Sequence, residues 1–80
     1  MTRKADLFFY TTAGCHLCEQ AEALLIQLID QRQVSIEAID IAESETLVDQ
    51  YGLRIPVVKA AKTEQELGWP FSLEDLASLI

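Results

Sequence analysis

Residues 15–18, Cys-His-Leu-Cys, contain both cysteines of the 80-residue chain. An apolar run, residues 7–10, and a short loop precede them, and a segment with helical spacing follows. This order places Cys15 at or just before a helix N-terminus, where free N–H groups and the helix dipole stabilise an anion. A free cysteine has a pKa of about 8.5, which falls to roughly 3.5–7.5 for Cys-x-x-Cys thiols at helix starts. The pattern therefore predicts a reactive thiolate at Cys15, with Cys18 near enough to form a disulfide with it.

Other interpretations of the two thiols are weaker. A structural disulfide across a two-residue gap would constrain little of the chain. A structural zinc site would need further ligands from a second chain or from outside donors, because this stretch offers only two thiolates with His16 between them. A lone cysteine is commonly a buried packing residue. The pairing at a helix start instead favours Cys15 as nucleophile and Cys18 as the thiol that resolves the mixed disulfide.

Several residues keep two interpretations. His16 is either an exposed loop side chain or an imidazolium that stabilises the thiolate and makes the pair more oxidising. Arg54 either binds a substrate carboxylate or forms a salt bridge on the acidic surface. Trp69 and Phe71 either pack beneath the last helix or touch substrate. Gly14 has a single interpretation: it loosens the backbone directly before the first thiol.

The composition excludes some classes of protein. A net charge of −7 argues against a nucleic-acid surface, which needs a basic stripe, and against adhesion to anionic membranes. Half of the residues are apolar, which suits a globular core. The apolar run after the basic start ends at Tyr10, too short for a signal peptide or a membrane span. We therefore expect a single domain, residues 1–80, with a frayed start over residues 1–5 and a cytoplasmic location.

Hydrophobic periodicity predicts seven elements in the order β-α-β-α-β-β-α. The helix between the first two strands is long enough for a parallel crossover, and the short turn between the last two predicts an antiparallel pair. The expected elements are a strand over 7–10, a helix over 19–32, a strand over 34–41, a helix from the cap Ser44 to a C′ residue at Gly52, a strand from Pro56, a strand over 65–69, and a last helix capped by Ser72 and Asp75.

This order, with Cys-x-x-Cys after the first strand and Ile55-Pro56 before the third, resembles the thioredoxin fold. The short chain resembles glutaredoxins, in particular the small bacterial glutaredoxin-like proteins. The resemblance is carried by Tyr10-Thr11-Thr12, residues 15–18, Arg54-Ile55-Pro56-Val57 and Trp69-Pro70-Phe71. It implies an α/β, thioredoxin-like (glutaredoxin-type) three-layer sandwich with a mixed four-stranded sheet. It also implies that Pro56 is cis and faces the thiols, and that the Ile55 backbone pairs with an extended disulfide substrate.

The chain departs from the glutaredoxin pattern in three places. His16-Leu17 replaces the usual Pro-Tyr between the thiols. Thr12 replaces a lysine that helps to bind a glutathione carboxylate. Residues 68–72, Gly-Trp-Pro-Phe-Ser, replace a Gly-Gly-acidic run near the other end of glutathione. We therefore expect these changes to weaken the binding of glutathione and to leave dithiol–disulfide exchange intact.

The sequence therefore predicts a glutaredoxin-like thiol–disulfide oxidoreductase. We expect Cys15 and Cys18 as catalytic residues, and Gly14, His16 and Ile55-Pro56 as substrate-binding residues. We expect no metal and no tightly bound cofactor, with glutathione or a thioredoxin-type reductase as electron donor. The expected partner is a disulfide-bearing protein or a glutathione mixed disulfide, and neither nucleic acid nor membrane.

Two alternatives stay open at this point. One is a metal-binding or iron–sulfur glutaredoxin-like module, in which Cys15 of two chains and outside thiols hold a cluster. The other is a partner-binding module that holds a peptide strand in the groove beside Pro56 without redox turnover.

Overall fold

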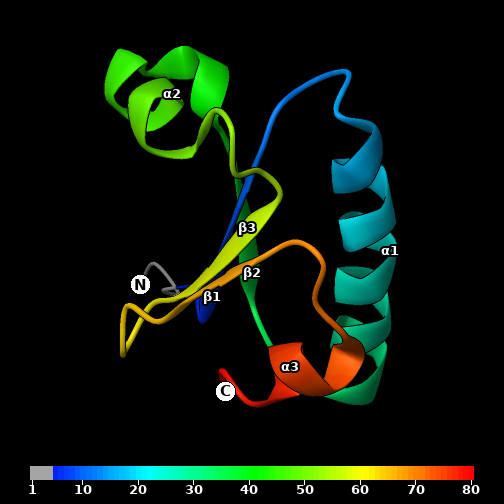
Figure 1. Ribbon diagram of the computed structural model, residues 1–80. Helices are drawn as coiled ribbons and strands as arrows, with labels where there is room; N and C mark the ends of the chain where they lie inside the picture. The colour runs from blue at the N-terminus through cyan, green and yellow to red at the C-terminus, as the bar shows by residue number, and fades with distance from the viewer. Residues whose placement is uncertain (1–4) are drawn as a thin grey trace.

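The computed structural model describes residues 5–80, and residues 1–4 of the predicted frayed start lie outside them. The predicted order of helices and strands is confirmed, with one short 3₁₀ helix added (Figure 1). The elements are β1 (Leu7–Thr11), α1 (His16–Gln31), β2 (Ile36–Asp40), η1 (Ile41–Glu43), α2 (Glu45–Tyr51), β3 (Val57–Ala60), β4 (Glu66–Gly68) and α3 (Leu73–Ala77).

The four strands form one mixed sheet in the order β2-β1-β3-β4. β1 and β2 run parallel and β3 and β4 run antiparallel, both as predicted, and β3 is also antiparallel to β1. In Figure 1, α1 and α3 lie on one side of this sheet and α2 on the other, so the fold has three layers. The predicted α/β sandwich is therefore confirmed.

Each face of the sheet has its own apolar cluster. On the α1 and α3 side, Leu7, Leu28 and Leu76 are at most 1% exposed. On the α2 side the cluster consists of Tyr10, Ile41, Tyr51 and Val57. Burying one such aliphatic side chain contributes about 1.5–3 kcal/mol. The partly buried Ile55 packs against both clusters, so the segment before β3 contacts both faces of the sheet.

The predicted helix caps are present. The Ser44 hydroxyl accepts from the Leu47 N–H at 3.3 Å at the start of α2. At α3, the Ser72 hydroxyl accepts from the Asp75 N–H at 3.1 Å, and the Asp75 carboxylate accepts from the Ser72 N–H at 2.9 Å. This reciprocal capping box satisfies two N–H groups that a short helix would otherwise leave open.

Some predicted boundaries were wrong. The second strand ends at Asp40, because the Asp40 carboxylate accepts from the Ala42 N–H at 2.9 Å and starts the 3₁₀ turn. Gly52 ends α2 as predicted, but as a helical C-cap residue with φ −53° and not as a left-handed C′ residue. The third strand begins at Val57 and not at Pro56, which has no N–H to donate to a strand ladder.

No helix within residues 5–80 has the length and apolar character that crossing a membrane requires.

Candidate active site

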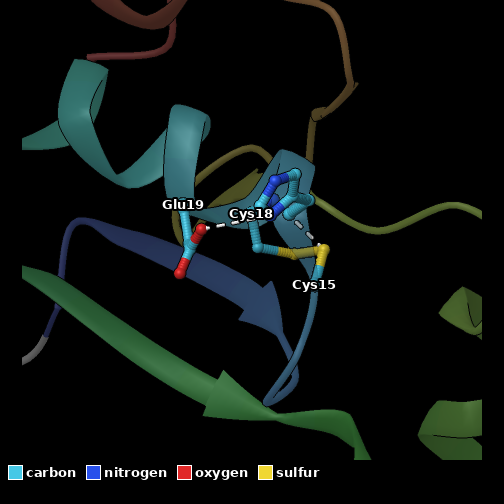
Figure 2. The surroundings of a disulfide bond; sticks show 4 residues. Cys15, Cys18 and Glu19 are labelled. Atoms are coloured by element: carbon cyan, nitrogen blue, oxygen red, sulfur yellow. Dashed lines mark hydrogen bonds and ion pairs between the residues drawn. A yellow bond between two sulfur atoms is a disulfide. The ribbon is translucent and has the colours of Figure 1, made fainter.

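Cys15 and Cys18 are joined by a disulfide, with their Cα atoms 5.2 Å apart (Figure 2). Cys18 lies inside the first turn of α1 and is 3% exposed, whereas Cys15 is partly exposed. An incoming group therefore meets Cys15 first. This difference in exposure matches the predicted order of a nucleophile followed by a buried resolving thiol.

Cys15 is the N-cap residue of α1, as the sequence predicts. Its backbone is extended, with φ −83° and ψ 104°, and its Sγ accepts from the Cys18 N–H at 3.1 Å. An N-cap side chain that accepts from an amide in the first turn satisfies one of the open donors of the helix. In the reduced protein the same donor and the helix dipole would stabilise negative charge on this sulfur.

Gly14 gives the loop before the first thiol a backbone conformation that other residues adopt rarely. Its φ is +80°, in the left-handed region. A Cβ at this position would meet nothing within 4 Å, so backbone strain and not space is what favours glycine here. The positive φ turns the chain from β1 toward the start of α1.

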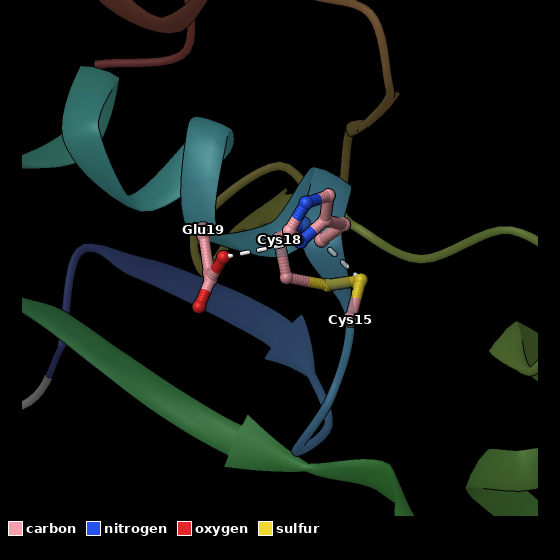
Figure 3. Close-up of polar contacts among 4 residues, drawn as sticks. Cys15, Cys18 and Glu19 are labelled. Carbon is pink, nitrogen blue, oxygen red and sulfur yellow. Dashed lines mark hydrogen bonds and ion pairs between the residues drawn. A yellow bond between two sulfur atoms is a disulfide. The ribbon is translucent and has the colours of Figure 1, made fainter.

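His16 projects away from the core beside the disulfide. Its side chain is 93% exposed, and its Nδ1 lies 3.4 Å from Oε2 of Glu19, one turn further along α1 (Figure 3). Within residues 5–80, Glu19 is the ion-pair partner of His16, and the pair is charged only when the imidazole is protonated. The geometry matches the first interpretation of His16, an exposed side chain, and an effect on the thiolate stays a prediction.

The sheet register brings two further segments to the end of the sheet that carries the cysteine loop. Tyr10, Val57 and Gly68 lie in one row across β1, β3 and β4. Past this row come the cysteine loop after β1, Pro56 before β3 and Trp69 after β4. The Trp69 N–H donates to the Pro56 carbonyl at 3.2 Å, which ties the last two together.

The Ile55–Pro56 peptide bond is cis, as is Trp69–Pro70. The Ile55 N–H donates at 3.0 Å to the Tyr51 carbonyl, so this donor is already used within the protein. Outside the helices and strands, no backbone N–H of residues 5–80 donates to the Ile55 carbonyl. Of the Ile55 N–H and carbonyl, the carbonyl is therefore the group without a backbone partner among residues 5–80, and it is the one that could pair with a substrate strand.

Trp69 and Phe71 pack against the core, in accord with the first of their two interpretations. Their rings meet edge to face with centroids 5.2 Å apart, and Phe71 is 6% exposed. Trp69 is partly exposed beside the Pro56 carbonyl. A contact between Trp69 and substrate stays a prediction.

A cluster beside this edge was not predicted from the sequence. The Tyr51 hydroxyl donates to Oε2 of Glu66 at 2.6 Å, and the Arg54 guanidinium donates to Oε1 of the same carboxylate at 2.8 Å. The hydrogen bond to Glu66 raises the pKa of Tyr51, and the hydrogen bonds from Tyr51 and then Arg54 lower the pKa of Glu66. Of the two roles considered for Arg54, the salt bridge is the one present.

Within the described part of the chain, no three His, Cys, Asp or Glu side chains lie together in a group that could hold a metal ion.

Residues 6–80 match the family described as Glutaredoxin-like domain (DUF836). The chain belongs to this glutaredoxin-like family, and the predicted resemblance is confirmed. None of the curated proteins matches the sequence.

Solved structures share the fold. The protein XcR50 from X. campestris is 35% identical, with a TM-score of 0.76 over 90% of this chain and 91% of that chain. Protein Ne2328 from Nitrosomonas europaea is 28% identical, with a TM-score of 0.79 over 100% and 95% of the two chains. The glutaredoxin grx-1 from Archaeoglobus fulgidus is 20% identical, with a TM-score of 0.58 over 94% and 85%, and it shows the shared fold alone.

Proposed function

We propose that this chain is a thiol–disulfide oxidoreductase of the glutaredoxin-like type. The observation that carries the proposal is the Cys15–Cys18 disulfide at the first turn of α1, with the outer sulfur partly exposed and the inner one buried. A pair of thiols in this arrangement can open and close a disulfide without moving the backbone far. The family match supports a redox role.

The reaction begins with the reduced pair. The Cys15 thiolate attacks one sulfur of a substrate disulfide, a mixed disulfide forms, and the other substrate sulfur leaves as a thiolate that takes up a proton. Cys18, deprotonated, then attacks the Cys15 sulfur, closes the internal disulfide and releases the second substrate thiol. Two electrons pass to the substrate, and the protein ends in the disulfide state described above.

An external donor must return the two electrons. Two molecules of glutathione, or one dithiol of a thioredoxin-type reductase, would reduce the internal disulfide by the same exchange chemistry. Neither donor is tightly bound in this proposal. The substrate is a disulfide-bearing protein or a glutathione mixed disulfide, and the setting is the cytoplasm, where thiol–disulfide exchange is transient and catalytic.

The remaining predicted residues form the surroundings of the reacting sulfurs. Gly14 shapes the loop that presents Cys15, and His16 is an exposed group at the rim. Ile55 and Pro56 directly precede β3 at the same end of the sheet as the cysteine loop, and in this proposal the Ile55 carbonyl accepts from an N–H of a substrate strand.

Coupled turnover tests the proposal. We expect the protein to reduce a mixed disulfide with NADPH as the final electron source, through glutathione and glutathione reductase or through thioredoxin reductase. Before each assay the protein is reduced, and a thiol titration verifies that Cys15 and Cys18 are both free. Absence of turnover in both would exclude the enzyme assignment.

Two cysteine variants assign the roles. Cys15→Ser should abolish mixed-disulfide formation, because it removes the attacking sulfur. Cys18→Ser should still form the mixed disulfide but should not resolve it by internal closure, so the captured group stays on Cys15 and mass spectrometry identifies it. Capture by Cys18 in the Cys15→Ser variant, at the rate of the intact protein, would reverse the assignment.

A further inference from the structure

The Glu66 carboxylate binds two side chains of the segment that precedes Pro56, those of Tyr51 and Arg54. Its Oε2 accepts from the Tyr51 hydroxyl at 2.6 Å, and its Oε1 accepts from Arg54 Nη2 at 2.8 Å. The Arg54 guanidinium also lies over the Tyr51 ring, 5.3 Å from its centroid, which is within cation–π range. The Tyr51 ring in turn stacks on Tyr10 of β1 at 4.3 Å. We call Tyr51, Arg54 and Glu66 the Glu66 cluster.

The backbone of the same segment closes on Tyr51. The Tyr51 carbonyl accepts from the Arg54 N–H at 2.8 Å and from the Ile55 N–H at 3.0 Å. Side-chain and backbone bonds together therefore fix the chain from the end of α2 to Ile55 against β4. The Pro56 carbonyl adds a second attachment to the same side of the sheet through the Trp69 N–H.

The stability of the fold alone does not call for all of these contacts. The Arg54 side chain is 51% exposed, and ion pairs at such positions contribute about 0–1 kcal/mol. The Tyr51 hydroxyl does need a partner, because the residue is 5% exposed. A carboxylate that holds both groups at once also restrains the direction of the intervening backbone, which a water molecule at the Tyr51 hydroxyl would not do.

This restraint acts on the segment that, under the proposed function, pairs with an incoming substrate strand. Ile55 follows Arg54 directly, and Pro56 lies at the sheet edge shared with the cysteine loop. Pairing with a strand requires the Ile55 carbonyl to point in one direction, and displacement of a positioning group by about 1 Å can lower a rate by about 100-fold. A small disulfide without a peptide backbone would not use this carbonyl.

We propose that the Glu66 cluster is a positioning device that holds the Ile55 carbonyl for the backbone of a polypeptide disulfide, and so sets a preference for polypeptides over small disulfides. The inference rests on the proposed function and adds a substrate class to it. Tyr51, Arg54 and Glu66 are positioning residues, because they act through the Ile55 backbone and do not touch the reacting sulfurs.

Two probes with the same leaving group isolate this effect. In one, the cysteine of an extended peptide is linked to 2-nitro-5-thiobenzoate; in the other, 2-mercaptoethanol is linked to it. Attack by Cys15 in the Cys18→Ser protein releases one coloured thiolate from either probe and leaves the peptide or the mercaptoethanol on Cys15. The ratio of the two second-order rate constants measures the preference for a peptide, without turnover or an external reductant.

We expect Tyr51→Phe, which keeps the ring on Tyr10, and Glu66→Gln each to lower this ratio about tenfold, with the small-probe rate constant within about twofold of the parent. The matched control is Glu64→Gln, in the turn between β3 and β4. It removes the same charge, from an ion pair with Lys59 of β3, and should leave the ratio unchanged. Amide hydrogen exchange should also show faster exchange at Arg54 and Ile55 in Tyr51→Phe.

The outcomes separate the inference from the proposed function. A parent protein that reacts with neither probe contradicts the proposed function itself. A reactive parent with equal rate constants for the two probes, or variants that keep the parent ratio, overturns the inference alone. Should one variant lose both rates together through misfolding, Arg54→Gln, at a half-exposed side chain, decides the question by the same ratio.

Discussion

The backbone N–H of Cys18 lies 3.1 Å from Sγ of Cys15 and donates to it. The contact exists because Cys15 occupies the N-cap position of α1, whose first-turn amides have no partners within the helix. Reduction of the disulfide leaves these amides in place. The helix start then offers hydrogen bonds and a positive dipole end to the thiolate form of one cysteine and not of the other.

The first prediction concerns the reactivity of the reduced thiols. Iodoacetamide at neutral pH should modify Cys15 and spare Cys18, because a helix start favours the thiolate of the first Cys-x-x-Cys sulfur and Cys18 is buried. Peptide mass spectrometry after brief labelling identifies the modified residue, and the rate against pH gives the midpoint. Cys18→Ser serves as the control with one thiol.

Equal labelling of both thiols, or a midpoint at or above that of a free cysteine, would contradict this prediction. It would also favour the alternative in which the fold binds a partner without redox turnover.

The second prediction concerns His16. His16→Ala should change the alkylation rate of Cys15 at neutral pH by less than about twofold, because charges on exposed side chains are strongly screened. The imidazole is 93% exposed and faces Glu19 at 3.4 Å. Measurement of the rate at low and at high salt separates a charge effect from a local rearrangement. A rate tenfold slower than in the wild-type protein at low salt, with the difference between the two proteins disappearing at high salt, would instead assign His16 to the stabilisation of the thiolate.

Local sequence signals were sufficient for the parts of the site that depend on neighbouring residues. The Cys15 N-cap and the Ser72–Asp75 capping box each involve residues three apart in the chain, and both are present as predicted. The alternation of helix and strand patterns also sufficed for the order of elements. Boundaries were less certain, because a single side-chain bond, such as the one from Asp40, can end a strand early.

The Glu66 cluster depends on distances that the sequence does not encode locally. Tyr51 and Glu66 are separated by fifteen residues, and they meet only because β4 pairs with β3 in one register. A shift of one residue would turn Glu66 to the other face of the sheet. Tyr51 alone is typical of an apolar helix face, so its hydroxyl gave no signal of a partner.

The third prediction concerns the capping box of α3. Ser72→Ala should lower the free energy of unfolding by about 1 kcal/mol, because it removes the acceptor for the Asp75 N–H. The helix matters to the core since it carries Leu76, which is fully buried. Urea unfolding measures the loss. In a double-mutant cycle with Asp75→Ala, the two losses should be less than additive, because the two bonds form one reciprocal unit; strict additivity would contradict the capping box.

The fourth prediction concerns the pH dependence of stability. Hydrogen bonds from Tyr51 and then from Arg54 lower the pKa of Glu66 from its ordinary 4.5, so this carboxylate stabilises the fold above that pH and the contribution is lost as pH falls through the lowered value. The same bond raises the pKa of Tyr51 from its ordinary 10.0, so the contribution of the phenol is present below that pH and is lost as pH rises beyond it.

The difference in unfolding free energy between the wild-type protein and Glu66→Gln should therefore be largest between these two limits, at about 2 kcal/mol near neutral pH. It should shrink in acid, because a protonated Glu66 resembles glutamine, and in strong base, where the wild-type protein must ionise Tyr51 next to a carboxylate. Urea unfolding at a series of pH values measures it. Glu64→Gln, whose parent side chain is 80% exposed, should show a small difference throughout. A Glu66→Gln difference that stays constant from acid to base would mean that the Tyr51–Glu66 bond does not carry this stability.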